Sequence, residues 1–144
     1  MNHPFTYIGC FVKFEDFQSA IRDVRKNPLE NDIRYPHVTF AYRPTEVDRS
    51  LFGEKTHITI VGYGNDGVNE GLKVRLEADN PAIQSMIDQI EVPHITIAVS
   101  RDGEPVNTRN LSFEDIKPIE MEGTYGGYAR WGKVVVGDQR SQCH

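Results

Sequence analysis

Three short motifs in the sequence pair a histidine with a threonine two positions later. They are His37-Val38-Thr39, His57-Ile58-Thr59 and His94-Ile95-Thr96. Serine and threonine together number 14 of the 144 residues, so three such pairings by chance have odds of about one in a thousand. A proline also precedes the first and third histidines, Pro36 and Pro93. This repeated context singles out His37 and His94 as candidate catalytic residues.

The chemistry of such a pair follows from the geometry of a strand and the acidity of imidazole. Residues two apart on a strand point to the same face, about 6–7 Å from each other. Histidine titrates near neutral pH, so one imidazole of a pair can accept a proton while the other donates one. Threonine hydroxyls can donate hydrogen bonds to phosphate oxygens as charge develops on them. Two such strands would cleave a phosphodiester without a metal, and we expect a bell-shaped pH profile with its maximum near neutrality.

The elements that must position these motifs occur in the same order twice. Apolar and β-branched runs predict strands over 6–14 and 72–77, and amphipathic helices follow them, the first over 15–25. The second helix begins with Asn80 as its cap and Pro81 as its first residue. Each helix leads to a Pro-His strand. The strands predicted there and later in the chain cover 37–42, 56–63, 94–99, 116–121 and 133–136, with Gly126-Gly127 as a turn before the last.

This order indicates a degenerate internal duplication within one domain spanning residues 1–144. Its pseudo-repeats cover roughly residues 6–63 and 71–137. We therefore expect an α+β fold with two lobes, in which two antiparallel sheets face a central cleft and the helices lie outside.

The paired motif resembles the two-histidine (2H) phosphoesterase superfamily, which includes RNA 2′,3′-cyclic phosphodiesterases and 2′-5′ RNA ligase-like proteins. The family motif is a histidine, any residue and a threonine or serine between apolar residues. Pro36-His37-Val38-Thr39-Phe40 and Pro93-His94-Ile95-Thr96-Ile97 both match it. The resemblance covers roughly residues 7–136. It implies catalysis by His37, Thr39, His94 and Thr96, without a cofactor or metal, on a cyclic or 2′-linked phosphodiester of a nucleotide, a cyclic nucleotide signal or an RNA end.

Several basic and aromatic residues are candidates for binding the substrate. Arg43 and Arg101 follow the two motif strands and could hold a phosphate. Tyr125 and Tyr128 could stack on a base or pack in the core, whereas we expect Trp131 in the core. The full set of predicted substrate-binding residues is Tyr7, Tyr42, Arg43, Arg101, Tyr125 and Tyr128.

Two other interpretations stay open. A three-histidine zinc site could use His37, His57 and His94, although their spacing resembles no usual ligand motif. The domain could instead bind a nucleotide or RNA end without catalysis. His57 has no counterpart in the second repeat, so we expect it to support a sheet surface and to lie outside the catalytic pair.

Composition and net charge limit the classes of molecule that the protein is expected to bind. The formal net charge of −5 argues against a long nucleic-acid duplex but allows a nucleotide or a single RNA end. Cys10 and Cys143 form no metal or disulfide pattern. No leader-like start and no apolar run of membrane-spanning length occur, so we expect a cytoplasmic monomer that does not bind membranes.

Overall fold

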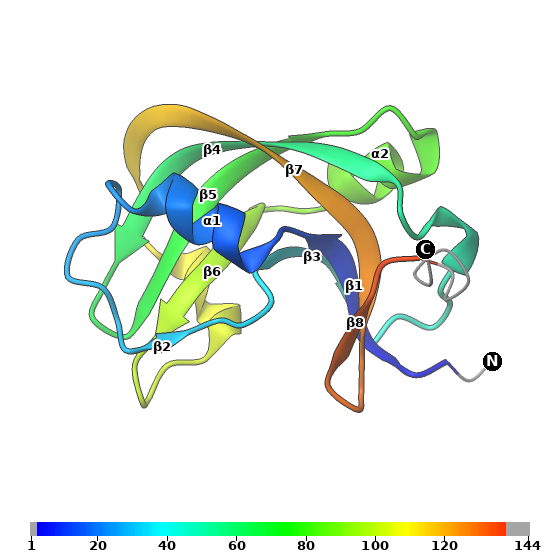
Figure 1. Cartoon of the computed structure of the whole chain (residues 1–144), viewed down its shortest axis with the longest axis horizontal. Coiled ribbons are helices and arrows are strands. Elements are labelled where there is room, and N and C mark those ends of the chain that lie inside the picture. Colours follow the sequence, from blue (N-terminus) through cyan, green and yellow to red (C-terminus); the bar gives the residue numbers. More distant parts are fainter. Residues whose placement is uncertain (1–2, 138–144) are drawn as a thin grey trace.

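The chain alternates strands with short helices over residues 3–137, which are the residues that the computed structural model describes (Figure 1). Their bounds are β1 (Phe5–Phe11), α1 (Phe14–Ile21), β2 (Asn31–Asp32), β3 (His37–Tyr42), η1 (Arg49–Leu51), β4 (Lys55–Asn65), β5 (Asn69–Glu77), α2 (Pro81–Asp88), β6 (His94–Val99), η2 (Pro105–Asn110), β7 (Glu114–Ala129) and β8 (Lys133–Val135), where η1 and η2 are 3-10 helices. The fold is α+β, as expected.

Local sequence explains most of these bounds. The two motif strands begin at His37 and His94, as predicted. Helix α2 begins where its cap was expected, since the Asn80 side chain accepts hydrogen bonds from the amides of Ala82 and Ile83. Helix α1 ends at Ile21, earlier than predicted. The chain turns there, and Arg25 forms an ion pair with Glu70 on β5.

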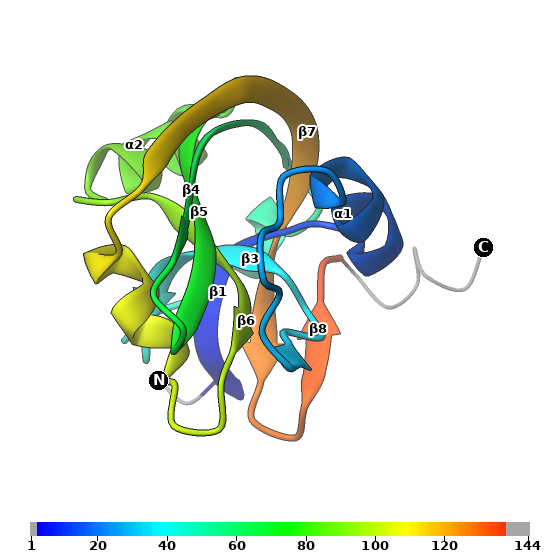
Figure 2. The same cartoon turned by 90° about the vertical axis from the view of Figure 1, so that its left-hand side faces the viewer.

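The prediction of two separate sheets is wrong for the described part of the chain. The strands form one antiparallel sheet in the order β2-β6-β5-β4-β7-β1-β3, with β8 paired to β7. The long strands β4 and β7 pair with each other and join the two expected lobes (Figure 1). The β7 strand arches over the molecule, and the side view in Figure 2 shows the same curvature. The edge strand β3 and the strand β6 contact each other without pairing.

The two strand–helix–strand units have the same pairing details. In the β1–β3 pair Gly9 lies opposite Thr39 and Phe11 opposite His37. In the β5–β6 pair Gly71 lies opposite Thr96 and Lys73 opposite His94. Each ladder shifts register at one place, and the residue skipped is the one that follows the threonine in both units. Each motif strand therefore carries its β-bulge at the same position.

Both helices cover one face of the sheet. Phe17 and Ile21 of α1 lie in the larger core cluster, with buried residues of β4, β5 and β6. Ile83 and Ile87 of α2 lie in a second cluster with Ile8 and Tyr125. No helix within residues 3–137 combines the length and hydropathy needed to cross a membrane.

The predicted turn at Gly126-Gly127 is also wrong, because both glycines lie inside β7. Their role is close packing, since a Cβ on Gly126 would lie 2.4 Å from the carbonyl oxygen of Val135 on β8. The chain turns later, before β8. Trp131 lies in that later turn and is 59% exposed, so the expectation that it packs in the core is wrong too.

Candidate active site

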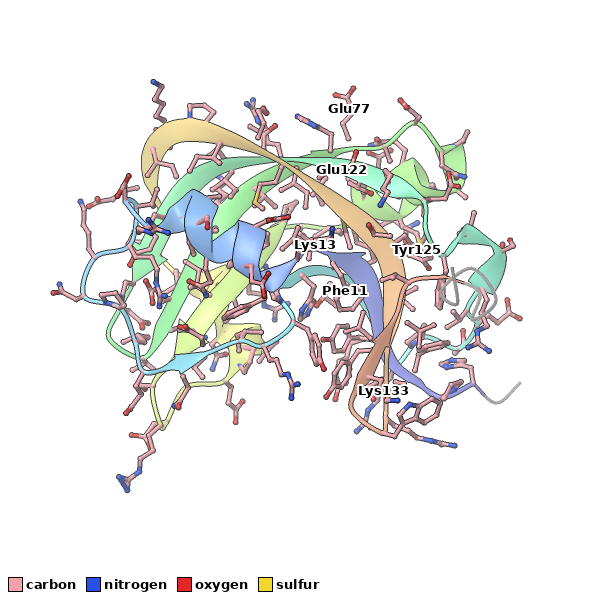
Figure 3. The ribbon with its side chains drawn as sticks, viewed as in Figure 1. Phe11, Lys13, Glu77, Glu122, Tyr125 and Lys133 are labelled. Carbon is pink, nitrogen blue, oxygen red and sulfur yellow. The ribbon has the colours of Figure 1, made fainter. Side chains whose placement is uncertain are left out.

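His37 and His94 project from the same face of the sheet, opposite to the face that the helices cover. Side chains directly opposite each other on paired strands share a face. His94 lies opposite Lys73 on β5, and His37 lies opposite Phe11 on β1. The pairing of β5 with β4, of β4 with β7 and of β7 with β1 then places Lys73 and Phe11 on the same face. Figure 3 labels Phe11, the cross-strand neighbour of His37, near the middle of the molecule at the end of β1.

Each imidazole is held by the same backbone contact. The Nδ1 atom of His37 lies 2.7 Å from the carbonyl oxygen of Tyr35, and that of His94 lies 2.7 Å from the carbonyl oxygen of Val92. A carbonyl only accepts hydrogen bonds, so Nδ1 carries the proton in both residues. The proline that precedes each histidine also accepts the same kind of hydrogen bond. The amides of Val12 and Val74 donate to the carbonyls of Pro36 and Pro93, each at 3.1 Å. The Nε2 atom is thus the nitrogen without a proton when either imidazole is neutral.

The two imidazoles interact electrostatically. Burial lowers the pKa of His37 to about 4; the hydrogen bond to Tyr35 opposes this shift, and the charge of His94 adds to it. Burial also lowers the pKa of His94, with a further contribution from Arg109. The tertiary structure therefore brings the two predicted catalytic histidines together and favours the neutral form of each.

The two threonines differ. Thr39 is half-buried on β3, and its hydroxyl has no hydrogen-bond partner among the described residues. Thr96 is only 7% exposed, and its hydroxyl lies 3.1 Å from the carbonyl oxygen of Pro105 and 2.7 Å from the hydroxyl of Thr108. Of these two hydroxyls, only that of Thr39 has no partner within residues 3–137.

A row of aromatic rings stands beside His37. Tyr7 on β1 lies between His37 on β3 and Tyr128 on β7, with ring centroids 4.4 Å and 5.1 Å away. Phe11 lies 5.3 Å from His37, and Tyr35 lies 6.0 Å from Tyr128. The Tyr7 hydroxyl is 3.5 Å from Nδ1 of His37, too long to compete with the Tyr35 carbonyl. Tyr7 and Tyr128 are thus at the site, with Tyr7 packed against His37.

The other predicted binding residues lie elsewhere. Tyr125 is 1% exposed and packs in the cluster beneath α2. It is three residues from Tyr128 on one strand, so the two point to opposite faces. Tyr42 and Arg43 are exposed at the far end of β3 from His37, and Arg101 is exposed in the turn beyond β6. Arg43 has a backbone φ of 48°, which is uncommon for a residue other than glycine.

His57 is separate from the pair. It lies exposed on β4, and its Nε2 atom forms an ion pair with Glu120 at 3.0 Å. Within residues 3–137, no three His, Cys, Asp or Glu side chains are grouped closely enough to hold a metal ion, so the alternative zinc site is not assembled. Figure 3 shows Glu77, the cross-strand neighbour of His57, projecting outward from the sheet.

Two residues of the site were not predicted from the sequence. Lys73 is the cross-strand neighbour of His94, and Arg109 at the end of η2 is close enough to lower the pKa of His94. The glycine–x–lysine sequence over 71–73 parallels the glycine–x–phenylalanine sequence over 9–11. That parallel could have identified Lys73. No local pattern points to Arg109.

A pocket of about 700 Å³ adjoins the site on the His37 side. Its lining residues are Val12, Lys13, Phe14, Glu15, Asp32, Arg34 and Tyr35. It does not include either histidine, but Tyr35 connects it to the aromatic row. The pocket is a largely open depression beside the aromatic row.

Comparisons with known proteins add no assignment. No protein-family model matches the chain, and no curated protein matches it significantly.

Proposed function

We propose that the protein is a metal-independent phosphodiesterase of the 2H type, which cleaves a cyclic or 2′-linked phosphodiester of a nucleotide or RNA end. The catalytic residues are His37 and His94, with Thr39 as a hydrogen-bond donor to the phosphate. Tyr128 and the pocket beside Tyr35 are candidates for holding the nucleoside.

One observation carries the proposal. Two Pro-His-x-Thr strands have the same register and bulge, and each imidazole has its Nδ1 atom on the carbonyl two residues earlier. A histidine with only a structural role would not need this arrangement. In His37 and His94 together, it leaves two Nε2 atoms free on one face of the sheet. This is the arrangement that acid–base catalysis at one phosphate requires.

The same details support an internal duplication. The strand order, read outward from the β4–β7 pair, is β5 then β6 on one side and β1 then β3 on the other. Each side thus contains a first strand and a motif strand, joined along the chain through a helix, and the two-residue β2 adds to the edge of β6. We propose that the two units are divergent copies that form the two walls of a cleft, connected by β4 and β7.

The surroundings suggest which histidine does what. Aromatic rings enclose His37, and burial favours its neutral form, so His37 suits the general base. His94 faces Lys73, and no aromatic ring within residues 3–137 stacks on it. A bound phosphodiester anion would raise the pKa of His94 and so protonate it, which suits the general acid.

The direct test is a substrate panel assayed in excess EDTA. It should contain 2′,3′-cyclic mononucleotides, cyclic di- and trinucleotides, 2′-5′ oligoadenylate and RNA ending in a cyclic phosphate. Turnover of at least one class in the chelator is expected. Activity that disappears with EDTA and returns with zinc would overturn the metal-independent mechanism.

The catalytic pair is tested by alanine variants on the active substrate. His37→Ala and His94→Ala should each lower kcat by about a hundredfold or more, because each removes a proton-transfer group. The double variant should be scarcely slower than either single one, since the two histidines act as a unit. Full activity of either single variant would remove that residue from the mechanism.

The alternative of a non-catalytic binding domain is favoured by one observation. Both histidines have lowered pKa values, so the free protein holds little imidazolium at neutral pH. A binder would saturate with a nucleotide without ever producing a product. The same panel, followed by phosphorus NMR over many protein equivalents, separates the two functions.

A further inference from the structure

The second half of the site lacks the hydrogen-bond donor that the first half offers. A hydroxyl has only one proton to donate. The hydroxyl of Thr96 uses its one proton inside the protein, because it donates to the hydroxyl of Thr108 at 2.7 Å or to the carbonyl of Pro105 at 3.1 Å. The hydroxyl of Thr39 has no such partner within residues 3–137. A phosphate between the two strands would therefore meet Thr39 on one side and no threonine proton on the other.

The segment that engages Thr96 is fixed firmly to the sheet. Asn69 on β5 donates its side-chain amide to the hydroxyl of Thr108 at 3.1 Å and to the carbonyl of Glu104 at 2.7 Å. Asn69 is 1% exposed and Thr108 is 0% exposed. Gly71 makes room for this contact, because a Cβ there would lie 2.2 Å from the methyl carbon of Thr108. The buried network fixes the position of η2 beside His94.

This segment brings positive charge to His94. Arg109 follows Thr108 directly, is exposed, and lies close enough to His94 to oppose its protonation. Lys73 adds a second cation, since it is the exposed cross-strand neighbour of His94. The equivalent neighbour of His37 is Phe11. One side of the site is therefore aromatic and the other is basic.

We propose that Arg109, positioned by the buried network of η2 and assisted by Lys73, binds the phosphate oxygens on the His94 side of the site. The guanidinium replaces the donor that Thr96 does not supply, and it offers paired hydrogen bonds to two oxygens of one phosphate. The inference rests on the proposed function for the identity of the ligand. It orients that ligand, with its phosphate toward Arg109 and its nucleoside toward the aromatic row.

The experiment measures binding, so that it does not depend on turnover. Adenosine 2′-monophosphate, adenosine 3′-monophosphate and inorganic phosphate are titrated into the full-length protein at pH 7 and followed by NMR. In Arg109→Gln the Kd of the nucleotides should rise by about tenfold or more, as expected for loss of a paired ionic contact. Arg22→Gln is the matched control, because this substitution removes the same charge from an exposed arginine at the end of α1.

Two further variants test the positioning role of the network. Thr108→Val removes the hydroxyl and should weaken nucleotide binding, whereas Thr108→Ser keeps the hydroxyl and should bind like the wild type. The pKa of His94, followed through its ring protons, should rise in Arg109→Gln and in Thr108→Val, because a nearby cation is removed or displaced. Lys73→Gln should weaken binding less than Arg109→Gln.

The outcomes separate this inference from the proposed function. Unchanged binding in Arg109→Gln, or equal weakening in Arg22→Gln, would overturn the inference even if the wild type hydrolyses a diester. Arg109-dependent binding without any turnover would preserve the inference and reject the phosphodiesterase. Equal affinity for inorganic phosphate and for the nucleotides would show that the site recognises phosphate alone and would overturn the proposed orientation of the nucleoside.

Discussion

At the scale of single residues, the two catalytic candidates share a backbone contact and differ in their surroundings. The carbonyls of Tyr35 and Val92 fix both imidazoles with Nε2 free. Rings of Tyr7 and Phe11 enclose His37, while a cation lies beside His94. Matched geometry with unmatched environments is how one site assigns two different proton-transfer roles.

The pH dependence follows from these environments. In the proposed mechanism His37 is the base and must be neutral, so kcat/KM should rise with pH through its pKa of about 4. His94 is the proposed acid and must be protonated, so kcat/KM should fall as pH rises through its pKa, which burial holds below the ordinary value. The maximum should lie on the acid side of neutrality, below the position that the motif alone suggests. A maximum above pH 7 in a steady-state profile of kcat/KM would contradict the assignment of roles.

His57 provides the residue-scale control for the pair. His57→Ala should change the rate by less than about tenfold, and mainly through KM or stability, because a residue outside the proton transfers affects kcat little. The structure gives His57 a surface ion pair with Glu120, away from the two proposed catalytic histidines. Steady-state kinetics beside His37→Ala check this. Loss of turnover in His57→Ala with an active His37→Ala would mean that the pair was misassigned.

At the scale of elements, the motif strands depend on a glycine in the neighbouring strand. Gly9 lies opposite Thr39, and a Cβ there would lie 2.1 Å from the carbonyl oxygen of Val38. The obstacle is backbone, which cannot rotate away as a side chain can.

Gly9→Ala should therefore destabilise the fold and misplace His37. Overpacking against backbone typically costs about 1–3 kcal/mol or more of unfolding free energy. Urea denaturation followed by circular dichroism measures the loss. Gly137→Ala is the control, because nothing lies within 4 Å of a Cβ there. Equal stability of the two variants would show that the β1–β3 pair does not need this glycine.

At the scale of the whole molecule, a buried ion pair connects the chain after α1 to the sheet. Glu70 on β5 is fully buried, accepts two hydrogen bonds from Arg25 at 2.9 Å and 2.7 Å, and accepts a third from Tyr63 at 2.7 Å. Burial alone would raise the pKa of Glu70, but its bonds to Arg25, Tyr63 and Leu29 lower it. The cluster holds the loop that leads to β2 and the first motif strand.

Glu70→Gln should lower the unfolding free energy by about 2–4 kcal/mol, because Arg25 loses its buried carboxylate partner and keeps only the more exposed Asp32. The native pKa of Glu70 is lowered, so its contribution to stability is present above the unfolded pKa of about 4.3 and is lost as pH falls through the native value. Thermal unfolding at pH 7 and pH 4 checks both points. The exposed Glu30→Gln in the same loop is the control. Wild-type stability of Glu70→Gln would remove this role.

The sequence alone determined the local structure and the two candidate histidines. The positions of β3, β6 and the start of α2 follow from alternation and from Asn80-Pro81, which act over a few residues. Only the tertiary structure decided the rest. Pairing of β4 with β7 merged the sheets, the unbroken β7 turned Tyr125 into the core, and η2 covered Thr96 and brought Arg109 to His94. These depend on contacts between residues far apart in the chain, and periodicity within one segment carries no information about them.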